Sequence, residues 1–540
     1  MRLVDKDTAK PPKERWIAVL AAALLVLGGS LLFFRGAFDA SNCDFNPDSV
    51  EYASAGRNLV DHGRCEITLA GHGFPSRYPP WFSTLVAAPA YLVFGREPGN
   101  PVYAVLAFAL FGLLAAFWVG RRLGGTWGGV ASATGLALLP TFALYARQIL
   151  ADVPSTTLAL VAAGSYLRLR EREAGQAWYW LSGAAAALAT GFRPLGGFLV
   201  LPAVMAILMT RPAHRGRRLI ALLLPVVVVI VGNAVFNART FGSPLRTGYS
   251  FWCSVPYDYT ALTFSGSYVL QNLRSMWTTG LPILVVAAVA IGLLRGKTGG
   301  PDAAPIQLRL RYLAEFALYS FVPLLGFHLI YFFSADRFFL PILAVALVAA
   351  GGALGSWIPR RWERLALLIP LLLVICGAYA RLTKPPDAPF RRLGVERIRR
   401  LTPVGSTILT GLDPVYTAFI LGANDTREII PLSRDVEYAS KLITPRRIPA
   451  PDPPPRGPFD HRCAGLVKAG AHEAVEIVVA ERPALIAERL QAGRAVFLDA
   501  TFVQPGDVAA IRALQASFTL EKVGEELFRV SRVRKAEPDR

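Results

Sequence analysis

Long apolar runs constrain the fold of this 540-residue chain more than any other feature. Runs of about 17–20 residues, enough helix to cross the hydrocarbon core of a bilayer, recur between Trp16 and Ala380. Hydrophobic residues make up 53% of the chain, above the share of an average soluble domain. The sequence therefore predicts a polytopic α-helical membrane protein.

Eleven segments are predicted to span the membrane. They are residues 16–34, 102–119, 127–145, 153–167, 179–192, 195–210, 219–237, 279–294, 313–332, 338–357 and 365–380. One further apolar run, Pro80 to Phe94, is ambiguous because it is short, opens on two prolines and contains Pro89.

Charge asymmetry decides how the run at 80–94 is interpreted. If it does not cross, the connections after residue 101 place 16 Lys and Arg on the side of the basic N-terminal tail (residues 1–15) and six on the other side. If it does cross, this distribution inverts and violates the positive-inside rule. We therefore expect 80–94 to lie in the interface or to dip in and return. The tail is then cytoplasmic, and the first loop (35–101) is extracytoplasmic.

The net charge of +19 has the same explanation, because much of it lies in these short connections. No RNA- or DNA-binding motif is present, so nucleic acid is not an expected partner.

Five cysteines are scattered along the chain. Cys43 and Cys65 flank the acidic part of the first loop and could form a disulfide outside the cytoplasm.

The chain changes character after the last apolar run. Residues 385–540 are polar, with a proline-rich stretch at 443–460. Strand-like runs occur at 406–410, 427–430, 475–480 and 494–499, and a helical run at 483–491 completes a βαβ pattern. The sequence predicts a small extracytoplasmic α/β domain. Because it has no glycine-rich phosphate loop and no nucleophile motif, we expect an accessory role.

The first loop concentrates acids near its start. Asp44, Asp48 and Glu51 lie within eight positions, and Arg77 follows just before Pro79-Pro80. If residues 48–57 are helical, Asp48, Glu51 and Tyr52 share one face. Such carboxylates can serve as a base, as metal ligands, or merely as a solvated helix start that the dipole favours, and Asp44 could cap the helix.

Other charged residues stand at the ends of predicted spans on the same side as this loop. They are Arg147, Asp152, Arg193 and Arg337. Taken singly, each arginine could be a snorkelling side chain, and Arg147 with Asp152 a local ion pair. Together with the loop acids they predict one site that binds phosphate and performs acid/base chemistry, because the arginine fork matches phosphate oxygens.

Five short motifs follow one another along residues 12–380. They are Pro47-Asp-Ser-Val-Glu-Tyr-Ala53, a proline-containing helix that ends at Phe94-Gly95, Ala151-Asp-Val-Pro154, the Gly-Phe-Arg193 turn, and Arg337-Phe-Phe-Leu-Pro341. Their order resembles the GT-C superfamily of polyprenyl-phosphate-sugar-dependent glycosyltransferases, in the branch of the protein O-mannosyltransferases and the lipid A aminoarabinose transferases. The chain departs from the pattern at Ser49, where a second acid is often found.

The resemblance implies a catalytic membrane domain at 16–381, in the plasma (inner) membrane, with its active site on the extracytoplasmic side. A sugar would pass, with inversion, from a polyprenyl-phosphate donor to a protein, lipid or polysaccharide acceptor. Asp48 would be the general base, supported by Asp44, Glu51 and Tyr52. The donor phosphate would be held by Arg193 and Arg337 with Arg77 or Arg147, and Asp152 would orient an arginine or the acceptor. The resemblance specifies no cofactor with certainty, and a divalent cation could take part.

Two other classes of protein compete with this reading. A secondary transporter or lipid flippase would also have about twelve apolar segments. Transporters, however, place their charged site near the bilayer midplane in repeated halves. Here the charges stand at helix ends, and no internal repeat is found. A scaffold for an envelope complex would explain the accessory domain but not the clustered charges.

Overall fold

The structure is a computed structural model with two compact units. The first, here the helical unit, comprises Met1–Cys43, Asn100–Arg239 and Gly266–Pro386. The second, the α/β unit, comprises Asp44–Gly99, Thr240–Ser265 and Asp387–Arg540. The structure describes residues 12–34, 45–69, 72–170, 175–210, 214–252, 257, 260–279, 303–333, 335–383, 390–412, 414–422, 425–432, 482–503 and 505–533.

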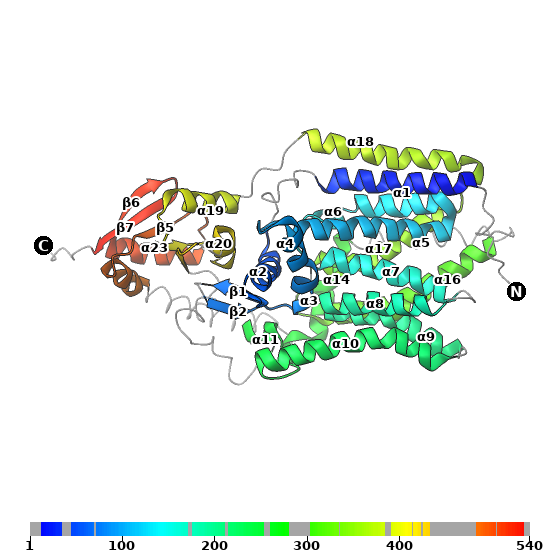
Figure 1. Ribbon diagram of the computed structural model, residues 1–540, viewed down its shortest axis with the longest axis horizontal. Coiled ribbons are helices and arrows are strands. Elements are labelled where there is room, and N and C mark those ends of the chain that lie inside the picture. Colours follow the sequence, from blue (N-terminus) through cyan, green and yellow to red (C-terminus); the bar gives the residue numbers. More distant parts are fainter. Residues whose placement is uncertain are drawn as a thin grey trace. The chain divides into compact units, whose positions relative to one another are not determined.

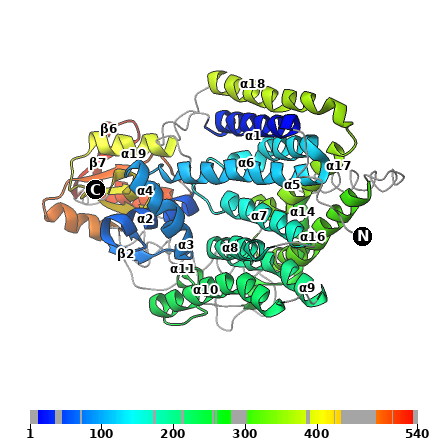
Figure 2. The same ribbon diagram turned by 45° about the vertical axis from the view of Figure 1, so that its right-hand side comes forward.

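The helical unit is a bundle of long apolar helices. Its elements are α1 (Pro12–Phe33), α5 (Pro101–Leu138), α6 (Pro140–Tyr145), α7 (Asp152–Arg170), α8 (Gln176–Phe192), η4 (Pro194–Val200), α9 (Leu201–Thr210), α10 (Arg215–Phe241), η5 (Gly266–Tyr268), α14 (Val269–Thr279), α16 (Ala303–Ile330), η6 (Asp336–Phe339), α17 (Leu340–Gly355), η7 (Arg360–Leu367) and α18 (Leu368–Thr383). Figures 1 and 2 show α18, α1, α5, α7 and α8 running alongside one another, and these neighbours are in contact.

The centre of this bundle is the pair α5 and α17, which approach closely through glycines. A side chain on Gly355 would collide with the backbone of Gly128, and one on Gly124 with the carbonyl of Gly352. Small residues at such spacing let membrane helices pack backbone to backbone. Helix α5 also kinks at Gly124 and Gly125, whose backbone angles are not helical. The predicted spans 102–119 and 127–145 begin on opposite sides of this kink.

Ten of the eleven predicted spans coincide with described helices, and 279–294 lies largely outside the described residues. Among the described residues, six helices are long and apolar enough to cross a membrane. The prediction of a polytopic helical membrane protein with a small C-terminal α/β domain is confirmed. The count of eleven spans stays a prediction.

The α/β unit joins the first loop to the C-terminal region. Its elements are α2 (Pro47–His62), β1 (Glu66–Leu69), β2 (His72–Pro75), α3 (Pro80–Phe82), η3 (Ser83–Ala87), α4 (Ala88–Phe94), α11 (Gly248–Trp252), α13 (Thr260–Thr263), α19 (Phe390–Leu401), β3 (Thr407–Thr410), α20 (Pro414–Leu421), β4 (Glu428–Pro431), β5 (Val496–Asp499), α23 (Pro505–Ser517), β6 (Phe518–Gly524) and β7 (Leu527–Val533). Residues 482–491 are also helical, as expected for 483–491. The domain boundaries proposed from the sequence stay a prediction.

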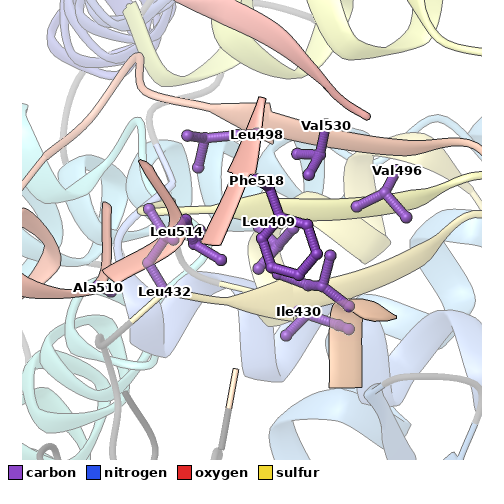
Figure 3. Close-up of a cluster of buried hydrophobic side chains, with 10 residues drawn as sticks. Leu409, Ile430, Leu432, Val496, Leu498, Ala510, Leu514, Phe518 and Val530 are labelled. Atoms are coloured by element: carbon purple, nitrogen blue, oxygen red, sulfur yellow. The ribbon is translucent and has the colours of Figure 1, made fainter. Parts of the chain in front are cut away.

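The C-terminal sheet has the strand order β4-β3-β5-β7-β6. Strand β3 pairs in parallel with β4 and β5, whereas β7 is antiparallel to β5 and β6. Its core contains Leu409, Ile430, Val496, Leu498 and Phe518 (Figure 3). Three of the predicted strands coincide with β3, β4 and β5, while 475–480 and 443–460 lie outside the described residues. The β6–β7 hairpin was not predicted.

The ambiguous run at 80–94 is a continuous helix, with a π-helical turn at Ser83–Ala87 between α3 and α4. One side packs on α2, where Ala87 meets Gly56. Leu92, Val93 and Phe94 are exposed. This helix is shorter than the six candidate spans, and its placement at the interface stays a prediction.

Candidate active-site clusters

The start of α2 places Asp48 in the first helical turn. Asn46 is the N-cap, and its side chain accepts a hydrogen bond from the Ser49 N–H at 2.8 Å. Pro47 follows as the first helical residue, where its missing N–H costs nothing. The helix dipole favours the Asp48 carboxylate in this turn. Asp44 lies outside the described residues, and the capping role considered for it belongs to Asn46.

Glu51, one turn further along α2, forms a buried ion pair with Arg77. Its carboxylate accepts hydrogen bonds from the Arg77 Nε at 2.5 Å, from the Arg77 N–H at 2.9 Å and from the Ser76 hydroxyl at 3.1 Å. The Arg77 Nη2 also pairs with it, and the Glu51 side chain is 1% exposed. The structure therefore joins two residues that the sequence had assigned to separate roles.

Tyrosines pack around this pair. Tyr52 stacks on Tyr78 with ring centroids 4.4 Å apart, and Tyr249 meets Tyr78 edge-on at 5.5 Å. Burial raises the pKa of Tyr78, and the neighbouring Tyr249 and the carboxylates of Asp48 and Glu51 act in the same direction. The Tyr78 hydroxyl thus lies in the electrostatic field of Asp48 and Glu51.

A second cluster lies in the helical unit and begins with Asp152, the first residue of α7. Its side chain is fully buried, and its Oδ1 accepts a hydrogen bond from the Arg193 Nη2 at 2.5 Å. Its Oδ2 is buried and has no hydrogen-bond partner among the described residues. Arg193 can reach Asp152 because α8 ends at Phe192 and Arg193 is extended, just before Pro194.

Two arginines of this cluster lie near the ring of Phe338. The guanidinium carbons of Arg193 and Arg337 lie 5.2 Å and 5.7 Å from its centroid. His328 stacks on the same ring, with centroids 4.9 Å apart and an interplanar angle of 16°. Cations are attracted to the face of an aromatic ring within about 6 Å. Two guanidiniums therefore lie near one aromatic ring.

Tyr145 and Arg147 stand just before α7 in the chain. The hydroxyl of Tyr145 lies in the electrostatic field of Arg337, Asp152 and Arg193. Arg147 is half-buried in the turn between α6 and α7, where its N–H donates to the Leu144 carbonyl at 3.3 Å.

Known proteins resemble this chain in sequence and in fold. The family described as dolichyl-phosphate-mannose-protein mannosyltransferase matches residues 71–237. None of the curated proteins matches the chain. ArnT from Cupriavidus metallidurans bound to undecaprenyl phosphate is similar over 97% of this chain and 99% of its own, with 14% identity and a TM-score of 0.60. This chain has a GT-C fold.

Two other solved structures support the same fold. ArnT in the apo state covers 96% of this chain and 98% of its own at 14% identity, with a TM-score of 0.59. The archaeal oligosaccharyltransferase AglB from Archaeoglobus fulgidus, in complex with an inhibitory peptide and a dolichol-phosphate, covers 97% and 75% at 11% identity, with a TM-score of 0.50. The resemblance to GT-C glycosyltransferases that the motif order predicted is confirmed.

The structure sorts the predicted site residues into two groups. Asp48, Glu51, Tyr52 and Arg77 belong to the α/β unit. Asp152, Arg193, Arg337 and Arg147 belong to the helical unit. Their convergence in one site stays a prediction.

Sequence reasoning missed the aromatic residues of both groups, Tyr78 and Phe338, and the buried His328. A signal for two of them was present, because Tyr78 directly follows Arg77 and Phe338 directly follows Arg337.

Neither group forms a ready metal centre. Within the ranges that the structure describes, no three His, Cys, Asp or Glu side chains are placed to hold a metal ion. The Glu51 carboxylate is already neutralised by Arg77. We assign no step to a metal.

Proposed function

We propose that the chain is an integral-membrane glycosyltransferase that moves a sugar from a polyprenyl-phosphate donor to an acceptor hydroxyl on the extracytoplasmic side, with inversion. The family match and the ArnT-like fold support this class of enzyme. One observation carries the proposal: Arg193 and Arg337 both lie near the Phe338 ring, and Arg193 is also hydrogen-bonded to the buried Asp152. Arginine suits this role because the guanidinium fork donates two parallel hydrogen bonds to phosphate oxygens.

Asp48 is our choice for the general base. Glu51 is occupied by three groups of Ser76 and Arg77, and its charge is neutralised there. Asp48 stands in the first turn of a capped helix, so the backbone that carries its carboxylate is ordered. A base must lie within hydrogen-bond reach of the proton that it removes, and a fixed backbone favours that geometry.

In the proposed reaction one C–O bond forms, one C–O bond breaks, and one proton is transferred. The acceptor hydroxyl gives its proton to the Asp48 carboxylate, and its oxygen attacks the anomeric carbon of the sugar. The bond between that carbon and the phosphate oxygen breaks, and polyprenyl phosphate leaves with the electron pair. Arg193 and Arg337 stabilise the negative charge that grows on the leaving phosphate.

Release of polyprenyl phosphate tests this proposal. The full-length protein is incubated with a panel of radiolabelled polyprenyl-phosphate sugars, and the lipid product is separated and counted. We expect release with at least one donor, and loss of release in Asp48→Asn. In proteoliposomes, movement of intact labelled donor across the bilayer without cleavage would instead establish the transporter class.

A further inference from the structure

The C-terminal region touches the helix of the proposed base, and both lie in the α/β unit. Helix α20 packs on α2 and on β1. It also follows β3 directly and leads to β4, so it belongs to the βαβ part of the C-terminal sheet. Leu409 and Ile430 on those two strands lie in the sheet's hydrophobic core (Figure 3). Helix α20 is therefore fixed to a packed sheet on one side and to α2 on the other.

Arg57 of α2 makes the central contact. It is 7% exposed, and its Nη1 donates a hydrogen bond to the Phe419 carbonyl at 2.9 Å across 362 residues of sequence. Its guanidinium carbon lies 4.2 Å from the centroid of the Phe419 ring. Burial lowers the pKa of Arg57, which reflects the cost of placing this cation in the interface. The hydrogen bond to the Phe419 carbonyl and the contact with the Phe419 ring act against that cost.

These contacts cap the end of α20. The last four carbonyls of a helix have no partner within the helix and carry its negative dipole end. Arg57 takes the Phe419 carbonyl, and Arg399 of α19 donates to the Ile420 carbonyl at 2.5 Å and the Leu421 carbonyl at 3.3 Å. Two arginines, one from the first loop and one from the C-terminal region, thus complete the same helix end.

A second contact lies on the other side of Asp48 along the chain. Phe45 is 4% exposed and meets the rings of Tyr416 and Phe419 edge-on, at 6.0 Å and 5.8 Å. Phe45 directly precedes the cap Asn46, and Arg57 stands nine residues after Asp48. Helix α2 is therefore held by α20 at two points with Asp48 between them in sequence. At about 100° per residue, Asp48 and Arg57 lie on opposite sides of α2.

We propose that the C-terminal region holds α2 in place through the contacts of α20 with Arg57 and Phe45, here called the bracket. Arg57 and Phe45 are then positioning residues for Asp48. The inference rests on the function proposed for Asp48. It gives the C-terminal region a role in catalysis that needs no ligand of its own: α20 contacts Arg57, which lies on the side of α2 opposite Asp48, and Phe45, which directly precedes the helix cap. A base held at two points keeps its carboxylate in one place.

The test compares full-length variants. Arg57→Met keeps the side-chain length and removes the hydrogen bond and the cation. Phe45→Leu removes the aromatic contacts without touching a charge. Arg57→Lys restores a cation that can donate. The matched control is Arg96→Met, because Arg96 pairs with Asp61 on the same helix at 2.7 Å but from within the first loop. Three quantities are measured for each variant: hydrogen exchange of the α2 amides, turnover of the donor, and donor affinity.

We expect Arg57→Met to accelerate exchange in α2 and to lower turnover by about tenfold, with donor affinity within about twofold of the parent, since one charged hydrogen bond is lost away from the donor. Phe45→Leu should act in the same direction, Arg57→Lys should recover part of the turnover, and the control should change none of the three. Unchanged α2 exchange in both Arg57→Met and Phe45→Leu would overturn the bracket. So would a loss of donor affinity as large as the loss of turnover.

The bracket and the proposed base fail in different measurements. If Asp48→Asn keeps full turnover, the function proposed for Asp48 is wrong, and the link from the bracket to catalysis falls with it. The exchange of α2 in Arg57→Met still decides whether α20 holds this helix.

Discussion

Asp48 and Glu51 stand one turn apart on α2, yet the structure gives them different partners. Glu51 neutralises Arg77, whereas Asp48 stands in the first turn of the helix. Asp48→Asn should keep the fold and lower turnover by about 10²–10⁴-fold, the usual contribution of a positioned base. Donor binding should not change. Sugar transfer and donor affinity, measured on the same preparation, check this expectation, and undiminished transfer would remove Asp48 from the role.

Glu51→Gln should lower the stability of the protein. It leaves the Arg77 cation without its carboxylate in a mostly buried place. We expect a loss of about 3 kcal/mol, the lower end for a broken buried pair, because 22% of the Arg77 side chain is exposed. Thermal unfolding of the purified protein measures this change. A variant with parental stability and abolished turnover would instead make Glu51 part of the chemistry.

Arg337 differs from a snorkelling arginine by its place on Phe338. Arg337→Lys should weaken donor binding because a point charge lacks the planar fork, and Arg337→Ala should weaken it further, by about tenfold or more for a lost charged hydrogen bond. Arg311→Ala is the control, because Arg311 is 76% exposed and pairs with Glu315 one turn away on α16. If Arg337→Ala binds the donor as tightly as the parent protein does, Arg337 is a snorkelling side chain at a helix end and does not bind the phosphate.

Among the elements, α5 and α17 depend most on residue size. A methyl group on Gly355 meets the backbone of Gly128, which cannot move without separating the two helices. Gly355→Ala should therefore destabilise the protein, by roughly 1–3 kcal/mol for overpacking. Gly326→Ala in α16 is the matched control, since nothing lies within 4 Å of the added carbon, and it should be neutral or slightly stabilising. Thermal unfolding of both variants in the same detergent compares them directly.

At the scale of the whole molecule, the prediction to test is the side of the membrane on which each part lies. The Lys and Arg distribution predicts an extracytoplasmic C-terminal region and a cytoplasmic connection before α10. With the five native cysteines replaced, Lys522→Cys should react with an impermeant maleimide in intact cells and Arg215→Cys should not. Both positions are exposed, so access to the reagent depends on the membrane alone. The reverse labelling pattern would invert the topology.

The sequence by itself determined the helical membrane class, the α/β character of the C-terminal region and the elements that carry the candidate residues. These follow from patterns within one segment: apolar run length, proline and glycine at helix ends, and alternation in strands. The motif order also indicated the GT-C resemblance. The pairing of charges was decided only by the tertiary structure, because the sequence offers several carboxylates and many arginines of similar local context. Packing selected Glu51 with Arg77 and Asp152 with Arg193, and it brought Arg57 to Phe419 across 362 residues. A buried charge is stabilised only by the groups that the fold places around it, and no local pattern specifies those groups.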